Sequence, residues 1–393
     1  MEWQKHLLED LTEPVRPITY GVVKPGDHDD QNGVVFVRGG DIADGRIDIP
    51  NLRTITQEVS QKYKRTLLRG GEILVSLVGN PGAVATVPSE LAGANIARQA
   101  GLIALKDGVD RKFVEYFLRS PAGQAAMGLF IKGAVQKVIN LGDLKRVEIP
   151  LPPLPIQRRI AGILSTYDDL IEVNTRRIKA LEEMARRTYE EWFVHYRFPG
   201  GDGTRPDGWA IGTLDDVVIL QRGFDLPRRD RMEGPHPIIS ASGVSGSHVE
   251  YKVKAPGLVT GRSGTLGEVM LAWDDFWPLN TTLWAKSLPT GSLFFAYYTL
   301  LQIDLVGFNT GAAVPTLNRN DIRGLVVEIP DRDTLDRFEQ IANSYHLFAK
   351  RLSDQNTNLR AQRDLLLPQL VSGAIDVSDA EVILPEPAEV AAE

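Results

Sequence analysis

Polar and basic residues gather in glycine-containing loops in both halves of the chain, and their side chains suit contacts with nucleic acid. Arg, Lys, Asn, Gln, Ser and Thr can hydrogen-bond to phosphate oxygens and base edges, and glycine lets backbone amides approach a phosphate closely. The candidates in the first half are Lys64, Arg65, Asn80, Asn95, Arg98, Gln99 and Lys137. Those in the second half are Arg222, Arg262, Ser263, Thr265, Asn280, Thr281 and Thr282. A solvated loop is the alternative for each of them, and Asn95 and Asn280 could instead have a buried structural role.

The sequence lacks the common motifs of catalytic and cofactor sites. It contains no GxxxxGK[ST] loop for a nucleoside triphosphate, no [ND]PP[YF] tetrapeptide and no GxSxG nucleophile elbow. The absence of cysteine excludes disulfides and thiolate metal sites, and the 6 histidines are scattered. We therefore expect no catalytic residue, no metal site and no cofactor on this chain.

Two long segments have apolar residues spaced alternately by four and three positions, a period typical of a helix that lies along another helix. The first segment, Ile156–Phe193, shows the pattern at Ile160, Leu164, Tyr167, Ile171, Asn174, Ile178, Leu181, Ala185, Thr188 and Trp192. The second shows it at Phe338, Ile341, Tyr345, Phe348, Leu352, Gln355, Leu359, Gln362 and Leu366. A shift of 181 residues places Ile160 on Ile341 and the polar Asn174 on the polar Gln355.

The segments that precede the two helices also repeat. The stretch GEILVSLVGNPGAVATV (71–87) aligns with GLVTGRSGTLGEVMLAW (257–273), and GAVQKVINLGDLKRVEIP (133–150) aligns with GAAVPTLNRNDIRGLVVEIP (311–330). The first alignment pairs Gly79 with Gly264, Gly82 with Gly267 and, without a gap, Asn95 with Asn280. The second pairs Gly133 with Gly311, Asn140 with Asn318 and Asp143 with Asp321.

This duplication predicts an α+β fold of two pseudo-symmetric, β-rich α/β domains joined by two long antiparallel coiled-coil helices. The expected boundaries are 1–150 for the first domain, 151–198 for the central helix, 199–330 for the second domain, 331–371 for the C-terminal helix and 372–393 for an acidic, disordered tail. The alternative is two independent domains whose surface helices never meet.

The net charge of −7 does not by itself decide for or against a nucleic-acid partner. Residues 372–393 contain six acids and no base, so the rest of the chain carries a net charge of only −1. There is no charged-then-apolar signal segment at the start and no run of about 18 apolar residues. We therefore expect a cytoplasmic protein.

Several long motifs resemble the DNA-specificity subunits of type I restriction-modification systems. The segments RGFDLPRRDR, VTGRSGTLGEV, FWPLNTTLWAK and GAAVPTLNRNDI are similar to one type of target recognition domain in that family. The segment GAVQKVINLGDLKRVEIPLPPLPIQRRIAGIL resembles the junction between a recognition domain and a conserved helix. The resemblance covers nearly the whole chain, and the acidic extension after Ser372 departs from it.

The resemblance implies that each domain reads one part of a split, asymmetric sequence in double-stranded DNA, and that the helices fix the gap between the parts. It also implies modification (methyltransferase) subunits that bind S-adenosylmethionine, methylate adenine and dock on the helices. Restriction subunits, which use ATP and Mg²⁺ for translocation and cleavage, would join that complex. Candidate partner contacts on the first helix are Arg158, Arg159, Arg176, Arg177, Glu182 and Glu183, with a solvated helix face as the alternative.

Two other functions remain open on the sequence. One is a self-sufficient nuclease or methyltransferase with attached recognition domains, and the other is a coiled-coil scaffold unrelated to DNA. The missing catalytic motifs disfavour the first, and the polar loops that recur in both halves disfavour the second.

Overall fold

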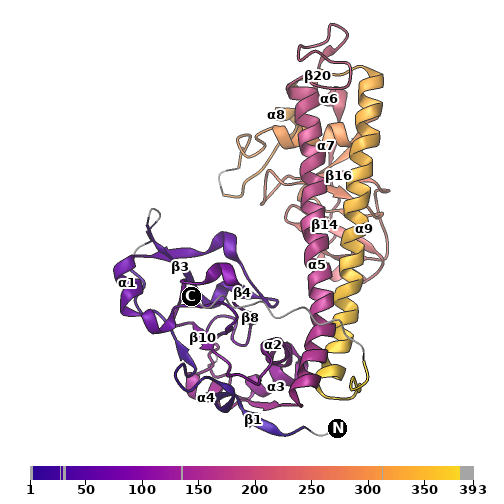
Figure 1. Cartoon of the computed structure of the whole chain (residues 1–393). Coiled ribbons are helices and arrows are strands. Elements are labelled where there is room, and N and C mark those ends of the chain that lie inside the picture. Colours follow the sequence, from indigo (N-terminus) through magenta and orange to yellow (C-terminus); the bar gives the residue numbers. More distant parts are fainter. Residues whose placement is uncertain (1–2, 27, 30–31, 134–135, 312, 381–393) are drawn as a thin grey trace. The chain divides into compact units, whose positions relative to one another are not determined.

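The computed structural model describes residues 3–26, 28–29, 32–133, 136–311 and 313–380. The chain divides into two compact units, which we describe one at a time. The first unit contains residues 1–172 and 357–393, and the second contains residues 173–356. Each unit combines a β-rich globular domain with part of two long helices (Figure 1), so the predicted α+β fold is confirmed.

The globular domain of the first unit is built on an antiparallel sheet with the strand order β2-β10-β7-β8. Its strands are β2 (Thr19–Tyr20), β7 (Ile73–Ser76), β8 (Val84–Thr86) and β10 (Ala100–Ile103). A second sheet has the order β6-β3-β9. The remaining strands of this unit are β1 (Lys5–Leu7), β3 (Val34–Val37), β4 (Ile42–Ala43), β5 (Arg46–Ile47), β6 (Arg53–Ile55), β9 (Asn95–Ile96) and β11 (Glu148–Pro150).

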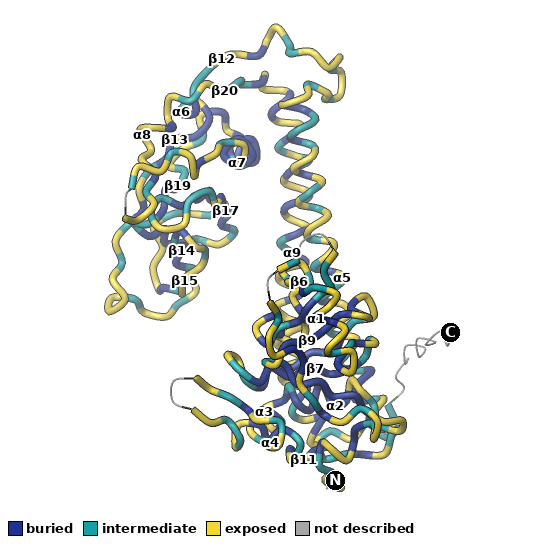
Figure 2. Tube along the Cα trace, turned by 90° about the vertical axis from the view of Figure 1, so that its left-hand side faces the viewer, coloured by how far each residue is buried: buried dark blue, intermediate teal, exposed yellow. Residues whose placement is uncertain are grey.

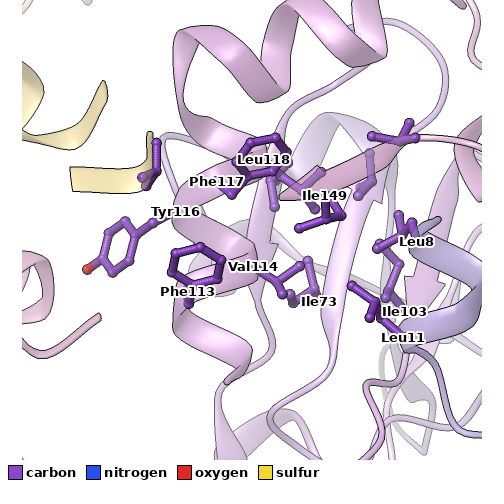
Figure 3. Close-up of a cluster of buried hydrophobic side chains, with 14 of the residues drawn as sticks. Leu8, Leu11, Ile73, Ile103, Phe113, Val114, Tyr116, Phe117, Leu118 and Ile149 are labelled. Carbon is purple, nitrogen blue, oxygen red and sulfur yellow. The ribbon is translucent and has the colours of Figure 1, made fainter. Parts of the chain in front are cut away.

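Three short helices contribute to the core shown in Figure 3. They are α2 (Arg111–Arg119), α3 (Pro121–Gly128) and α4 (Leu141–Lys145), whereas α1 (Gln57–Lys62) packs through Val59 on a separate cluster that contains Phe36 of β3 and Ile55 of β6. Helix α2 begins at Asp110, whose carboxylate accepts a hydrogen bond from the Phe113 amide at 2.9 Å. Phe113 and Val114 then pack with Ile73 of β7, and no side chain of these three is exposed.

The second unit repeats this architecture. The order β13-β19-β16-β17 matches β2-β10-β7-β8, and β15-β14-β18 matches β6-β3-β9, including the parallel pairing of its last two strands. The strands are β12 (Ala210–Thr213), β13 (Ile219–Arg222), β14 (His236–Ser240), β15 (Gly243–His248), β16 (Gly257–Gly261), β17 (Val269–Ala272), β18 (Trp277–Pro278), β19 (Thr282–Ser287) and β20 (Val326–Ile329). The short helices are α6 (Leu214–Val217), α7 (Leu293–Gln302) and α8 (Arg319–Ile322).

Backbone geometry confirms part of the predicted alignment and corrects another part. Gly79 and Gly264 have φ values of 90° and 97°, which a residue with a side chain rarely adopts. In contrast, the predicted pairing of Asn95 with Asn280 is wrong. The Arg98 amide donates to the Val22 carbonyl as the Asn280 amide donates to that of Phe224, so Arg98 is the equivalent of Asn280.

The correction follows from a difference in loop length. Eleven positions separate the starts of β8 (Val84) and β9 (Asn95), but only eight separate the starts of β17 (Val269) and β18 (Trp277). An ungapped alignment therefore slips by three residues after β8. Asn95 is the equivalent of Trp277, because each residue opens a short strand that pairs in parallel with a central strand.

Two long helices, α5 (Leu154–Tyr189) and α9 (Arg332–Val371), lie side by side and antiparallel (Figure 1). A π-helical turn at Glu190–Val194 follows α5, and α9 continues through Pro368. In the first unit, Leu164 of α5 and Leu367 of α9 belong to the same buried cluster. In the second, Tyr189 packs on Phe338, with ring centroids 6.0 Å apart.

The buried stripe of α9 differs from the predicted one by one residue over part of its length. Phe348 is 49% exposed and Gln355 is exposed, whereas their neighbours Ala349 and Asn356 are buried. Two neighbours account for this shift: His346 of α9 stacks on Phe294 of α7 at 4.8 Å, and Asn356 hydrogen-bonds to Asn174 of α5. Figure 2 shows exposed residues along the long helices.

Buried amides join the helices in the second unit. Asn174 Nδ2 donates to Asn356 Oδ1 at 3.0 Å and to Gln355 Oε1 at 3.3 Å, and Asn356 Nδ2 donates to Thr175 Oγ1 at 3.3 Å. We call Asn174, Thr175, Gln355 and Asn356 the polar layer. A buried amide at such a seam fixes the register of two helices, since any shift leaves its groups unpaired.

The segment after α9 differs from the predicted disordered tail. Residues 372–380 fold back on the first unit, where Val377 is buried and the Ser378 carbonyl accepts from Arg159 Nη1 at 2.6 Å. Gly373 lies so close to Trp3 that an added Cβ would meet the indole at 2.8 Å. The rest of the predicted tail, 381–393, lies outside the described residues. Among the described helices, none is both long and apolar enough to cross a bilayer.

Candidate nucleic-acid interface

The candidate residues of the second unit meet at one edge of its four-stranded sheet. Arg222, the last residue of β13, pairs with Leu283 of β19, and Gly261, the last residue of β16, pairs with Thr282. The end of β13, the end of β16 and the start of β19 are therefore adjacent. We call residues 222–225, 262–265 and 280–281 the loop edge of the second unit.

Backbone hydrogen bonds hold this loop edge together. The amides of Arg262 and Ser263 donate to the Thr281 carbonyl at 2.8 and 3.0 Å, and Arg262 Nη1 donates to the Asn280 carbonyl at 3.1 Å. Thr281 Oγ1 accepts from the Ala241 amide at 3.4 Å, whereas Thr265 is exposed. Arg222 is exposed, and Arg262, Ser263, Asn280 and Thr281 are half-buried. The edge therefore presents polar groups on a fixed backbone.

Asp225 belongs to this edge although it is not among the predicted residues. Its carboxylate accepts a hydrogen bond from Asn280 Nδ2 and lies 3.8 Å from Arg222 Nη2. It is acidic, whereas the predicted contacts are basic, amide and hydroxyl side chains. Its place three residues after Arg222, in a turn beyond a strand, is the sequence signal that could have identified it.

Thr282 does not fit the predicted role. Its side chain is fully buried, and its hydroxyl donates to the Leu279 carbonyl at 2.8 Å. The residue shapes the turn that leads into β19. The prediction of DNA contact is therefore wrong for Thr282.

The loop edge of the first unit, residues 78–80, 98–99 and 137, has the same construction. The Leu77 amide donates to the Gln99 carbonyl at 2.7 Å, as that of Arg262 does to Thr281. Asn80 and Arg98 are exposed, and Gln99 is half-buried. Lys137 is exposed and precedes Val138, which forms a β-bridge with Val78. The structure thus brings four of the seven predicted residues of this half together.

The other three predicted residues of the first half lie around β9. Lys64 and Arg65 are exposed on a single 3₁₀ turn, Lys64–Thr66. Asn95 has no exposed surface: its Nδ2 donates to Ser60 Oγ at 2.8 Å, and its Oδ1 accepts from Thr66 Oγ1 at 3.2 Å. The prediction of DNA contact is therefore wrong for Asn95, which supports the turn that carries Lys64 and Arg65.

Ionic contacts fix the first domain to the long helices within the first unit. The Asp168 carboxylate of α5 accepts from Tyr116 Oη at 2.7 Å, contacts Arg363 of α9 and lies 3.5 Å from Arg119 Nη1. Arg119 also donates to Glu115, which is fully buried, at 3.1 Å. Burial acts to raise the pKa of Asp168, but the Tyr116 hydrogen bond and the two guanidinium groups bring it below the usual value. We call Glu115, Tyr116, Arg119, Asp168 and Arg363 the junction network.

A cleft of about 860 Å³ opens beside the junction network, between Asn80, Arg46 and Arg360. Carboxylates such as Asp169 and Glu172 line it together with the arginines, so the cleft is not a basic channel. Across the described part of the chain, no three or more His, Cys, Asp or Glu side chains are grouped as a metal site would require.

Comparisons with known proteins agree on one family. The model of the type I restriction modification DNA specificity domain matches residues 2–183. The specificity subunit of the Escherichia coli type I restriction enzyme EcoBI is 35% identical over 175 residues, which cover 44% of this chain and 36% of that protein. That of Methanocaldococcus jannaschii MjaIX is 25% identical over 362 residues, which cover 83% of each.

One solved structure shares the fold over nearly the whole chain. The type I restriction-modification S subunit from M. genitalium superposes with a TM-score of 0.59 at 17% identity, covering 94% of this chain and 96% of that one. At this identity the likeness concerns the fold alone. The chain spans little more than a third of the E. coli relative but most of the M. jannaschii one.

Proposed function

The chain belongs to the family of type I restriction-modification DNA specificity subunits, and on that premise we propose that it gives such a complex its DNA target. Each unit reads one part of a bipartite, asymmetric sequence in double-stranded DNA through its loop edge. Chemistry is left to separate subunits, and the chain itself contributes no catalytic residue and no cofactor.

The observation that carries this proposal is that one loop edge is built twice with different side chains. Arg98 in the first unit corresponds to Asn280 in the second, and Gln99 corresponds to Thr281. The backbone hydrogen bonds that define these positions recur in both units, so the scaffold is shared and the hydrogen-bonding side chains vary. Arginine pairs best with guanine and asparagine with adenine, so equivalent positions would read different bases. A split target with two unlike parts follows.

The partners are proposed to be modification subunits, which bind S-adenosylmethionine and methylate adenine, and restriction subunits, which use ATP and Mg²⁺. Arg158, Arg177 and Glu182 are exposed on α5 and are available to such a partner, and Arg176 is exposed there too but already interacts with another group of the chain. Two other predicted contacts are already engaged: Arg159 donates to the Ser378 carbonyl, and Glu183 accepts from Arg186 and Arg187. The lengths of α5 and α9 are proposed to set the number of base pairs between the two parts of the target.

Mapping of methylated adenines tests the proposal in cells that carry this chain and its modification subunit. We expect one bipartite motif, which disappears when the gene for this chain is deleted. Arg98→Ala should weaken the preference for particular bases in one part of the motif, and Arg262→Ala should weaken it in the other part. Arg111→Ala and Lys286→Ala are matched controls, because both residues are exposed near the opposite ends of the same sheets.

Three results would count against this function. The first is a motif that survives deletion of the gene, and the second is a pair of variants that weaken the preference for the same bases. The third is turnover of DNA by the purified chain without partner subunits, which would favour a self-sufficient enzyme.

A further inference from the structure

Asp225 places an exposed carboxylate on the loop edge of the second unit, with 72% of its side chain exposed. Such a charge repels the phosphates of DNA, since binding depends on neutralising them. An exposed ion pair also contributes little to folding stability, typically below about 1 kcal/mol. Neither stability nor general DNA affinity therefore accounts for an acid at this place.

The contacts of Asp225 suggest what it does. It accepts from the Asn280 carboxamide and lies beside the Arg222 guanidinium, so one carboxylate ties two strand ends together. We propose that Asp225 is a positioning residue for base readout, which holds Arg222 against a guanine and Asn280 against a neighbouring adenine. This inference rests on the proposed function and adds the bases to which the second unit responds.

The donor and acceptor groups that remain support this assignment. The contact with Asp225 uses one N–H of Asn280 Nδ2 and leaves its second N–H and its Oδ1, the pair that matches N7 and N6 of adenine. Arg222 keeps its other N–H groups for O6 and N7 of guanine, and 53% of its side chain is exposed. The carboxylate therefore orients both groups and removes rotamers that would otherwise be lost on binding.

Arg262 completes the arrangement from the other side. Its Nη1 donates to the backbone carbonyl of Asn280 at 3.1 Å, which fixes the main chain that carries the carboxamide. Asn280 is thus held through its carbonyl by Arg262 and through its side chain by Asp225.

The first unit supplies an internal control, because its equivalent positions differ. The Val22 amide donates to the Ile96 carbonyl at 2.7 Å, as the Phe224 amide does to that of Pro278 at 2.8 Å, so Val23 stands where the second unit has Asp225. Arg98 stands in place of Asn280. The first unit therefore has no carboxylate at this position. The proposed positioning by Asp225 acts only on the part of the target that the second unit reads.

The test is a selection of bound sequences from randomised DNA by the complex of this chain with its modification subunit. The variants are Asp225→Asn, Arg222→Ala, Arg222→Lys and Asn280→Ala. Asp274→Asn is the matched control, since this exposed acid lies between β17 and β18, at the opposite end of the sheet, and its variant removes the same charge.

We expect Asp225→Asn and Arg222→Ala to lose the preference for one guanine in the second half-site by about 10-fold or more. Arg222→Lys should lose it too while keeping affinity for non-specific DNA, because lysine lacks the bidentate fork. Asn280→Ala and Asp225→Asn should both lose the preference for the adjacent adenine. The first half-site and the Asp274→Asn variant should keep the wild-type preference.

Specific outcomes would overturn the inference. In one, the folded Asp225→Asn complex keeps every base preference. In another, it weakens binding equally for all sequences and changes the salt dependence, as expected of a phosphate contact. A wild-type complex without any sequence preference would instead overturn the proposed function itself.

Discussion

Replacing Asp168 by alanine should weaken the first unit by about 2–3 kcal/mol. The carboxylate accepts hydrogen bonds from Tyr116 and Arg363 and lies 3.5 Å from Arg119. A hydrogen bond to a charged group contributes roughly 1.5–3 kcal/mol, and breaking a buried pair costs more because the partner charges stay behind. In the variant, Arg119 still forms an ion pair with Glu115, and Arg363 still forms one with Asp364. These ion pairs offset part of the lost stability.

Hydrogen exchange at neutral pH measures this effect locally. A loss of this size corresponds to about 100-fold faster exchange in helix α2, which carries Tyr116 and Arg119. Helix α7 in the second unit should be unaffected. Because the pKa of Asp168 is lowered on folding, its stabilisation is complete above the unfolded pKa of about 4 and is lost as pH falls through the folded value. The variant should therefore lose less stability than the wild type in acid.

Asp169→Ala is the matched control, because this neighbouring carboxylate faces the cleft and its pKa is raised, first by burial. Its charged form is thus disfavoured by folding, and its removal should leave exchange in α2 unchanged or slower. If Asp168→Ala accelerates α2 no more than Asp169→Ala does, the junction network does not fasten the domain to the helices.

Further predictions concern the second unit. Asn174→Leu should cost about 1–3 kcal/mol by removing the Nδ2 donor to the buried Asn356 Oδ1, and the double variant with Asn356→Leu should recover much of this, as followed by urea unfolding. Gly264→Ala should cost about 1–2 kcal/mol through its φ of 97° alone, since no atom lies within 4 Å of an added Cβ; a thermal melt that shows no loss would contradict this. Burial lowers the pKa of His346 to about 4, so the wild type should lose on the order of 3 kcal/mol as pH falls from about 6.5 to 4. His346→Gln should lose less over that range, and parallel pH profiles of the two proteins would contradict a pKa of His346 that is lowered by folding.

The long helices and the duplication could be predicted because both leave periodic or repeated signals in the sequence. The spacing of Ile160, Leu164 and Ile171 depends on one helix packing along another, and all three residues are buried. The buried stripe of α9 was predicted less accurately, because Phe348 and Ala349 are both apolar and either could lie on the buried face of the helix. Packing against α7, which no local pattern reveals, decides which of them is buried.

The candidate sites were predictable only in part. Residue type identified Arg98, Arg222 and Arg262, but it could not separate exposed polar groups from buried ones. Asn95 and Thr282 satisfy buried partners instead, and the three-residue difference in loop length hid the true equivalent of Asn280. Asp225 was not predicted because its proposed role depends on its contacts with Asn280 and Arg222, which the folded strand ends bring together.

The division of the chain has a consequence for its synthesis and for its genetics. The second unit is continuous, whereas the first closes only when Leu370, Val371 and Val377 reach the core begun by the N-terminal residues. During translation the second unit can therefore fold while the first still waits for its last segment. A premature stop codon shortly before position 367 would leave the continuous unit intact and damage the other one. Mutations in the codons for residues 367–377 would thus affect the part of the target that is assigned to the first unit.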